Sequence, residues 1–268
     1  MFADLTGDLD VLNTQCLQAP LIEIASGTVN FGPMDEWNSW YHYLLGQLLP
    51  RSHEQFVSSL LELLITGFVA IYPNGAGSPP YEGFEADVLN TLGRCMMEPH
   101  CWNDGEIAVG SFLHRSDNNP AQVWCWWDAS GDFSASMFFC LKYLPQESLQ
   151  DWIASVFAIR SPHWRAQVIA WLVGAHAVLD CQIAWPSAFD FEARPHIGWE
   201  YSHILGNRLG TSLLSRESAS TMLAAAKQFF SASTYEEWAR SINSVHYLKS
   251  EMAEIPDLFR KLYVTPDA

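Results

Sequence analysis

The sequence has few basic residues, no closely spaced cysteine pair and no long apolar run, and each absence excludes a class of protein. It contains 14 Lys and Arg against 30 Asp and Glu, and the resulting formal charge of −16 repels phosphate backbones. We therefore expect no nucleic-acid partner. The six cysteines form no CxxC pair, which argues against a zinc ribbon or a thioredoxin-like centre. No stretch approaches the roughly 18 consecutive apolar residues of a membrane helix, so we expect no membrane partner.

Signals for export and for several catalytic classes are also missing. The N-terminal segment MFADLTGDLD lacks the basic head and apolar run of a secretory signal, so we expect a cytoplasmic protein with buried thiols rather than disulfides. The chain contains no GxSxG, SxxK or Walker A motif. We therefore assign no catalytic residue. We expect no cofactor, and the one that the sequence allows is a transition metal held by His196, Glu200 and His203.

The overall composition is typical of a globular protein. Apolar residues make up 49% and charged residues 16% of the 268 positions, which is enough for one sizeable core. We expect a single helical domain over residues 1–268, with a less regular N-terminal segment over residues 1–32. The charge is uneven, because residues 1–141 hold 17 acidic and 3 basic side chains whereas residues 142–268 hold 13 and 11. This asymmetry favours an acidic face that attracts a basic partner.

Apolar side chains at helical spacing predict that most of the chain is α-helical. One stripe covers residues 37–48, and Pro50 is expected to end that helix before a second one over residues 56–72. Thr234 and Glu237 have the spacing of a capping box at a later helix start. The other stripes predict helices over residues 149–157, 168–179, 219–230 and 238–245. The predicted fold class is mainly α, an array of antiparallel helical hairpins that is either α-solenoid-like or an irregular bundle.

Two stretches in the first half of the chain favour small β-hairpins. The first is PLIEIASGTVNF over residues 20–31, in which a Ser-Gly turn separates two short β-prone runs. The second pairs residues 106–114 with residues 121–129 around the polar segment RSDNNP. We therefore expect one or two small hairpins beside the helices.

The segment VWCWWD at residues 123–128 allows two interpretations, core packing or ligand binding. Strand alternation would place Trp124 and Trp126 on one face and Trp127 on the other. Indole rings bury large areas, but each needs an acceptor for its N–H group. A ribbon with large rings on both faces is either sandwiched between helices or lines a pocket on one side. Trp124, Trp126 and Trp127 are therefore candidate ligand-binding residues.

Residues 144–179, LPQESLQDWIASVFAIRSPHWRAQVIAWLVGAHAVL, resemble one helix–turn–helix unit of the HEAT and armadillo class. The features that carry the resemblance are two amphipathic helices, a proline-marked turn, and Arg165 at the start of the second helix. The Asp that usually precedes the turn arginine is absent. The resemblance covers about one repeat unit. It implies an α-solenoid that presents a concave surface to other proteins.

The segment PHIGWEYSH at residues 195–203 is the best candidate for a metal site. A helix that starts at Pro195 would place His196, Glu200 and His203 at positions i, i+4 and i+7 on one face. Imidazole and carboxylate are good ligands for zinc or iron, and Glu-x-x-His is the spacing found in di-iron bundles. The alternative is a polar cluster that binds no metal, because the motif occurs only once.

Three functional hypotheses follow from these observations. The first is a non-catalytic interaction protein whose acidic face binds a basic partner, as an inhibitor or immunity-type protein or as a scaffold. The second is a metal-dependent helical enzyme that uses His196, Glu200 and His203. The third is a small-molecule binder with a tryptophan-lined pocket. The sequence does not determine the oligomeric state or the identity of any partner.

Overall fold

The mainly α fold class is confirmed by a computed structural model of the chain. It describes residues 3–12, 14–27, 34–55, 60–75, 79–97, 126–186, 199, 201–252 and 255–264. Within these ranges the protein consists of helices and connecting turns and contains no β-strand; one isolated bridge joins Pro73 and Gly75. No helix in these ranges combines the length and the apolar character needed to span a membrane.

The helices form two groups along the chain. The first group comprises the 3-10 helices η1 (Ala3–Thr6) and η2 (Leu9–Val11) and the α-helices α1 (Thr14–Ser26), α2 (Met34–Gln55), α3 (Leu60–Ile71), α4 (Phe84–Leu92) and α5 (Arg94–Met97). The second group comprises α8 (Trp126–Tyr143), α9 (Gln146–Phe157), α10 (Pro162–Leu179), α11 (Ser202–Leu209), α12 (Arg216–Phe229), α13 (Ala232–Asn243), α14 (His246–Glu251) and α15 (Ile255–Tyr263).

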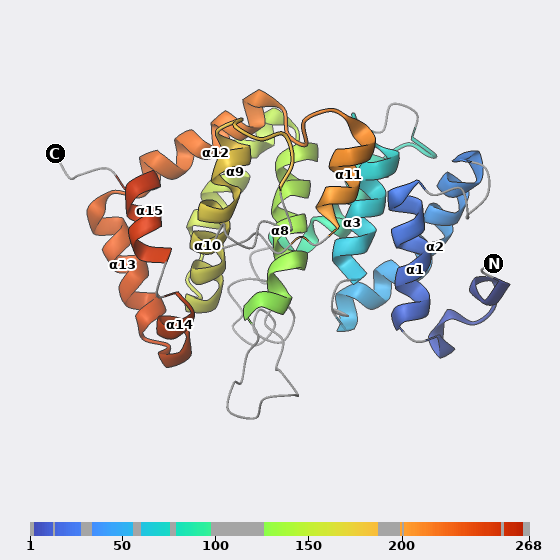
Figure 1. Ribbon diagram of the computed structural model, residues 1–268, viewed down its shortest axis with the longest axis horizontal. Coiled ribbons are helices and arrows are strands. Elements are labelled where there is room, and N and C mark those ends of the chain that lie inside the picture. Colours follow the sequence, from blue (N-terminus) through green and yellow to red (C-terminus); the bar gives the residue numbers. More distant parts are fainter. Residues whose placement is uncertain are drawn as a thin grey trace.

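These helices lie side by side along the long axis of the molecule (Figure 1). The α1 and α2 helices form the N-terminal end, α8 lies near the middle, and α13, α14 and α15 form the C-terminal end. One helix departs from this order, because α11 follows α10 in the sequence but packs against α1 and α3. In a solenoid each repeat contacts only its neighbours along the chain, so the return of α11 is a departure from that packing order.

The α3 helix is the core helix of the N-terminal half. Every position from Leu61 to Ala70 is buried, which is expected where a helix is apolar around most of its circumference. The neighbours that cover α3 are α1, α2, α4, α8 and α11. Tyr41 of α2 is fully buried against it and donates a hydrogen bond to the Leu64 carbonyl oxygen at 2.7 Å. Residues distant in sequence therefore meet on one central helix.

The α10 helix has the same role in the C-terminal half, where it packs against α8, α12, α13 and α15. Two of these helices, α12 and α13, start at serine N-caps. Ser215 accepts a hydrogen bond from the Ser218 amide before α12, and Ser231 accepts one from the Thr234 amide before α13. The predicted cap at Thr234 is therefore wrong by three residues, because a serine upstream satisfies the first free amides of that helix.

The first predicted hairpin is wrong, because residues 20–26 belong to α1. The apolar side chains on this helix face α3, with Leu17, Leu21 and Ile24 buried. Gly27 has a φ of 70°, and its amide bonds the Glu23 carbonyl oxygen at 3.0 Å. The Ser-Gly pair is therefore a helix C-terminus rather than a hairpin turn. Within the described part of residues 1–32, α1 is therefore a regular helix.

The predicted helix break at Pro50 is also wrong. The α2 helix runs from Met34 through Pro50 to Gln55. Proline removes one backbone hydrogen bond from a helix and bends it, but neighbouring bonds and packing can carry the helix past it. The α1 helix provides a second example, because Pro20 lies in its interior.

Candidate functional site

The predicted metal site is only partly covered by the described residues. His203 is half-buried on α11, whereas His196 and Glu200 lie outside the described ranges. Among the residues that are described, no group of three or more His, Cys, Asp and Glu side chains could hold a metal ion. The metal site therefore stays a prediction.

The helical geometry assumed for that site is wrong where it can be checked. Trp199 and Tyr201 are not helical, and α11 begins only at Ser202. The Ser202 hydroxyl donates to the Trp199 carbonyl oxygen at 2.8 Å, so a serine-stabilised turn precedes the helix. A single helical face that begins at residue 195 and includes residue 203 is thus excluded.

Trp199 anchors this turn to the core of the N-terminal half. Its side chain is fully buried, and its Nε1 donates to the Thr66 Oγ1 of α3 at 3.0 Å. Its ring lies 5.9 Å from the ring of Phe138 on α8. One helical turn before Thr66, the buried Glu62 accepts a hydrogen bond from the Tyr201 amide at 3.2 Å. No local pattern indicates this contact, because it joins residues 139 positions apart.

The three tryptophans predicted to bind a ligand are also only partly included in the described residues. Trp124 lies outside the described residues, and Trp126 and Trp127 form the start of α8. The strand predicted over residues 121–129 is therefore wrong from Trp126 onward. Successive side chains on a helix are separated by about 100°, so the strand alternation that set Trp126 opposite Trp127 does not apply. Ligand binding by these three residues stays a prediction.

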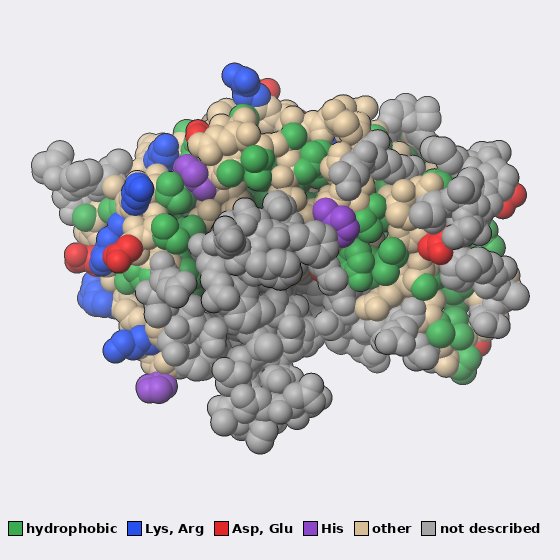
Figure 2. Space-filling model, in the orientation of Figure 1, with side chains coloured by type: hydrophobic (Ala, Val, Ile, Leu, Met, Phe, Trp, Pro, Cys, Tyr) green, Lys and Arg blue, Asp and Glu red, His purple; other side chains and the backbone are tan. Residues whose placement is uncertain are grey.

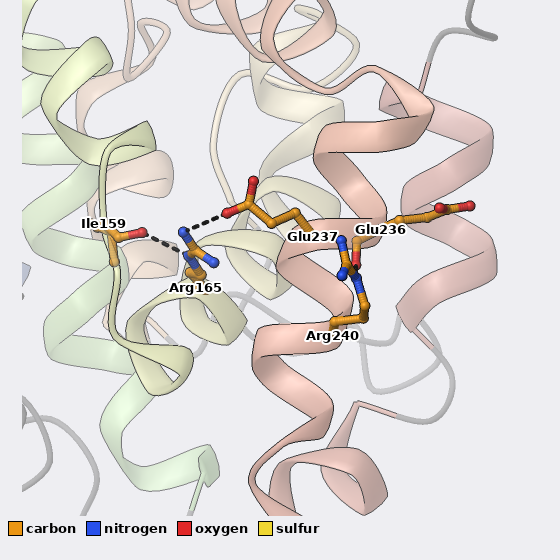
Figure 3. Close-up of polar contacts among 5 residues, drawn as sticks. All are labelled: Ile159, Arg165, Glu236, Glu237 and Arg240. Carbon is orange, nitrogen blue, oxygen red and sulfur yellow. Dashed lines mark hydrogen bonds and ion pairs between the residues drawn. The ribbon is translucent and has the colours of Figure 1, made fainter.

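Arg165, one of the residues on which the resemblance to HEAT and armadillo repeats depends, has a structural role (Figure 3). Its Nε donates to the Ile159 carbonyl oxygen at 2.7 Å and closes the turn between α9 and α10. Its Nη2 lies 3.3 Å from the Glu237 Oε1, and its guanidinium lies 5.1 Å from the centre of the Trp238 ring. Arg165 thus joins the turn to α13. The resemblance to HEAT and armadillo repeats itself stays a prediction.

A groove at the N-terminal end combines aromatic rings with a carboxylate. It has a volume of about 400 Å³ and is lined by Thr6 of η1 and by Glu36, Ser39, Trp40 and Tyr43 of α2. The Trp40 and Tyr43 rings meet edge to face at 5.9 Å, and Tyr43 donates to the Leu5 carbonyl oxygen at 2.9 Å. This last bond fixes η1 beside α2. A ring face next to an exposed carboxylate is suited to an Arg or Lys side chain.

Basic side chains are segregated along the molecule, whereas Asp and Glu side chains lie toward both ends of the face drawn (Figure 2). Every Lys and Arg whose side chain is described follows residue 141, and on the face drawn they gather toward the end formed by α12 to α15. The exposed carboxylates described in residues 1–141 are Asp8, Glu36, Glu82, Glu85 and Asp87, whereas Glu23 is partly buried and Glu62 is buried. The groove on α2 therefore lies in a part of the molecule where described side chains provide no compensating cation.

The features that bear on function are the groove on α2, the distribution of charged side chains and the buried Trp199. No family model matches the sequence, and no curated protein or solved structure matches it.

Proposed function

We propose that this chain is a non-catalytic interaction protein whose acidic N-terminal half binds a basic surface on a partner protein. The observation that supports this most directly is the groove on α2, where the exposed Glu36 lies with Trp40 and Tyr43. A guanidinium or ammonium group would pair with the carboxylate and stack on a ring. The roles that suit such a surface are an inhibitor or immunity-type protein directed at a basic toxin, or a scaffold.

The segregated charge supports the same proposal at longer range. Residues 1–141 hold 17 acidic and 3 basic side chains, so their field attracts a cationic surface before contact. Electrostatic attraction of this kind accelerates association and orients the partner, whereas short-range contacts determine how long the complex lasts. The groove would supply those contacts.

We expect the Glu36→Gln, Trp40→Leu double variant to bind an arginine-rich peptide roughly tenfold more weakly than the unmodified chain. The estimate adds an exposed ion pair to a cation–π contact, each worth about 0.5–1 kcal/mol. Fluorescence anisotropy of a labelled peptide measures the dissociation constant. The single Glu36→Gln change should account for a few-fold of the loss.

The matched control is Glu147→Gln on α9, an exposed glutamate in the other half of the chain. It removes the same charge as Glu36→Gln, so the net charge of the two variants is identical. We expect it to change affinity less than twofold, since it leaves the groove intact. Equal losses in the two glutamine variants would show that the peptide senses only net charge, and the groove would lose its assigned role.

A further inference from the structure

A second cavity lies between the two halves of the molecule and has a different chemistry. Its volume is about 390 Å³, within the range of small-molecule sites. It is bounded by the end of α3, by α4, by the end of α8 and by the segment 212–215. No residue of this cavity belongs to the groove on α2, so a ligand bound here would be independent of the proposed function.

Three aromatic side chains form one part of the cavity wall. Phe68, Phe139 and Tyr143 form a triangle of rings whose centres are 5.0 to 5.6 Å apart. The Tyr143 hydroxyl is already used, because it donates to the Tyr72 carbonyl oxygen at 2.8 Å. The rings are an apolar part of the lining, and Tyr143 is the partly exposed one, because Phe68 and Phe139 are buried.

Lys142 is the one cation among the described residues that line the cavity. Its Nζ donates to the Leu213 carbonyl oxygen at 2.8 Å, and it lies 5.6 Å from the Tyr143 ring centre. It forms no ion pair with a described carboxylate, although Glu85 lines the same cavity. An ammonium group has three donors, so two remain for a ligand. A partly buried cation without an anionic partner costs folding free energy, and a bound anion would offset that cost.

From this geometry we infer that the cavity binds a small apolar carboxylate, with the acid group on the Lys142 ammonium and the apolar body against the rings of Phe68, Phe139 and Tyr143. The carboxylate would accept the two ammonium hydrogens that Leu213 leaves unused. A ligand with a cationic group would instead be repelled by Lys142. Glu85 is exposed on α4, so solvent screens its repulsion of the bound acid.

The test uses 3-phenylpropanoate and its neutral amide as probes of the full chain in isothermal titration calorimetry. The two molecules have nearly the same shape, so they differ mainly in the charge that Lys142 would recognise. We expect the carboxylate to bind about tenfold more tightly than the amide, as a charge-assisted hydrogen bond should provide. Equal binding of both, or binding of neither, would overturn the inference without the use of any variant.

Two variants test the role of Lys142. Lys142→Met retains the aliphatic stem and removes the partly buried charge, so we expect it to fold and to bind 3-phenylpropanoate at least about tenfold more weakly. Glu85→Gln is the control at the same cavity and should bind the probe as tightly as the unmodified chain or more tightly. Loss of binding in Glu85→Gln with retention in Lys142→Met would contradict the inference.

The pH dependence provides a further check. Burial lowers the pKa of Lys142 to about 8, so the ammonium is present below that pH and is lost above it. Affinity for the carboxylate should therefore fall roughly tenfold from pH 7 to pH 9. An affinity that stays constant over this range would contradict the inference.

The tyrosines and the histidine near Lys142 should not titrate between pH 7 and pH 9. Burial raises the pKa of Tyr143 well above its usual value, and it also raises the pKa of Tyr72. Burial lowers the pKa of His42, which bonds the Tyr72 hydroxyl at 2.6 Å, so this imidazole is neutral throughout. Glu85 of α4 is the one carboxylate among the described residues that line the cavity, and segment 212–215 contains no titratable side chain.

Discussion

Replacement of Trp199 by alanine is expected to lower the free energy of unfolding by about 3–5 kcal/mol, the usual cost of removing a large buried ring. The side chain is fully buried and lies against Phe138, so its loss leaves a cavity between α3 and α8. The change also removes the N–H group that donates to the Thr66 Oγ1. The Thr66 hydroxyl donates to the Glu62 carbonyl oxygen at 2.6 Å, so it would keep this bond but lose the one that it accepts. Urea denaturation followed by circular dichroism measures the difference.

The Trp199→Phe variant separates packing from hydrogen bonding. It retains most of the ring but removes the N–H donor, so we expect a loss of about 1–2 kcal/mol. A globular domain is stable by only about 5–15 kcal/mol, so the alanine variant should be close to unfolding in moderate urea. If alanine cost less than about 1 kcal/mol, the docking of this turn on α3 would be wrong.

Phe259→Ala in the last helix is expected to cost a similar amount, about 3–5 kcal/mol. Phe259 is fully buried, and its ring lies 4.8 Å from that of Phe230, 5.3 Å from that of Tyr235 and 5.1 Å from that of Tyr263. Removal of the ring opens the contact between α15 and its neighbours. Thermal and urea unfolding of the purified variant measure the loss.

Leu258 supplies the matched control on the same helix. Its side chain is 40% exposed, so Leu258→Ala should change stability by less than about 0.5 kcal/mol.

The Tyr263 hydroxyl donates to the Leu172 carbonyl oxygen at 2.7 Å and therefore accepts from His176, whose Nδ1 lies 3.0 Å away. These bonds hold α15 on α10 together with the ring cluster. Equal effects of the two alanine variants would mean that α15 is not packed as described.

Sequence periodicity predicted the C-terminal half well. The stripe at residues 149–157 belongs to α9, where Leu149, Trp152 and Val156 are all buried. The stripe at residues 219–230 belongs to α12, where Ala219 and Met222 are buried. These helices are amphipathic, and the spacing of their apolar side chains indicates which face packs against the core. In α9 and α12 the local pattern and the tertiary packing agree.

The errors in the N-terminal half have a common physical cause. Pro20 and Pro50 are strong local signals against a helix, yet both lie inside helices that pack against the core. Burial of α1 on α3 outweighs the local cost of Pro20. The packing of α11 on α1 and α3 was equally beyond prediction, because no local pattern indicates which distant segment a short helix will meet.

The candidate sites also differ in how far the sequence predicts them. Net charge and its asymmetry follow directly from composition, so the acidic half was predictable. The groove requires η1 to lie beside α2, and the cavity at Lys142 requires four separate segments to converge. Such convergence has no signature in sequence spacing. The turn that Ser202 forms with Trp199 just ahead of α11 also had no clear signal in the sequence, and the metal site itself stays a prediction.

The association rate of an arginine-rich peptide at several salt concentrations tests the central claim most directly. If the acidic half attracts its partner, the rate measured by stopped-flow fluorescence should fall roughly tenfold between about 20 and 150 mM salt. Neutralising Asp8, Glu36 and Glu82 to their amides should reduce both the rate and its salt dependence. The same number of changes at Glu147, Asp151 and Glu217 should have a smaller effect. A rate that does not respond to salt would contradict the proposed function.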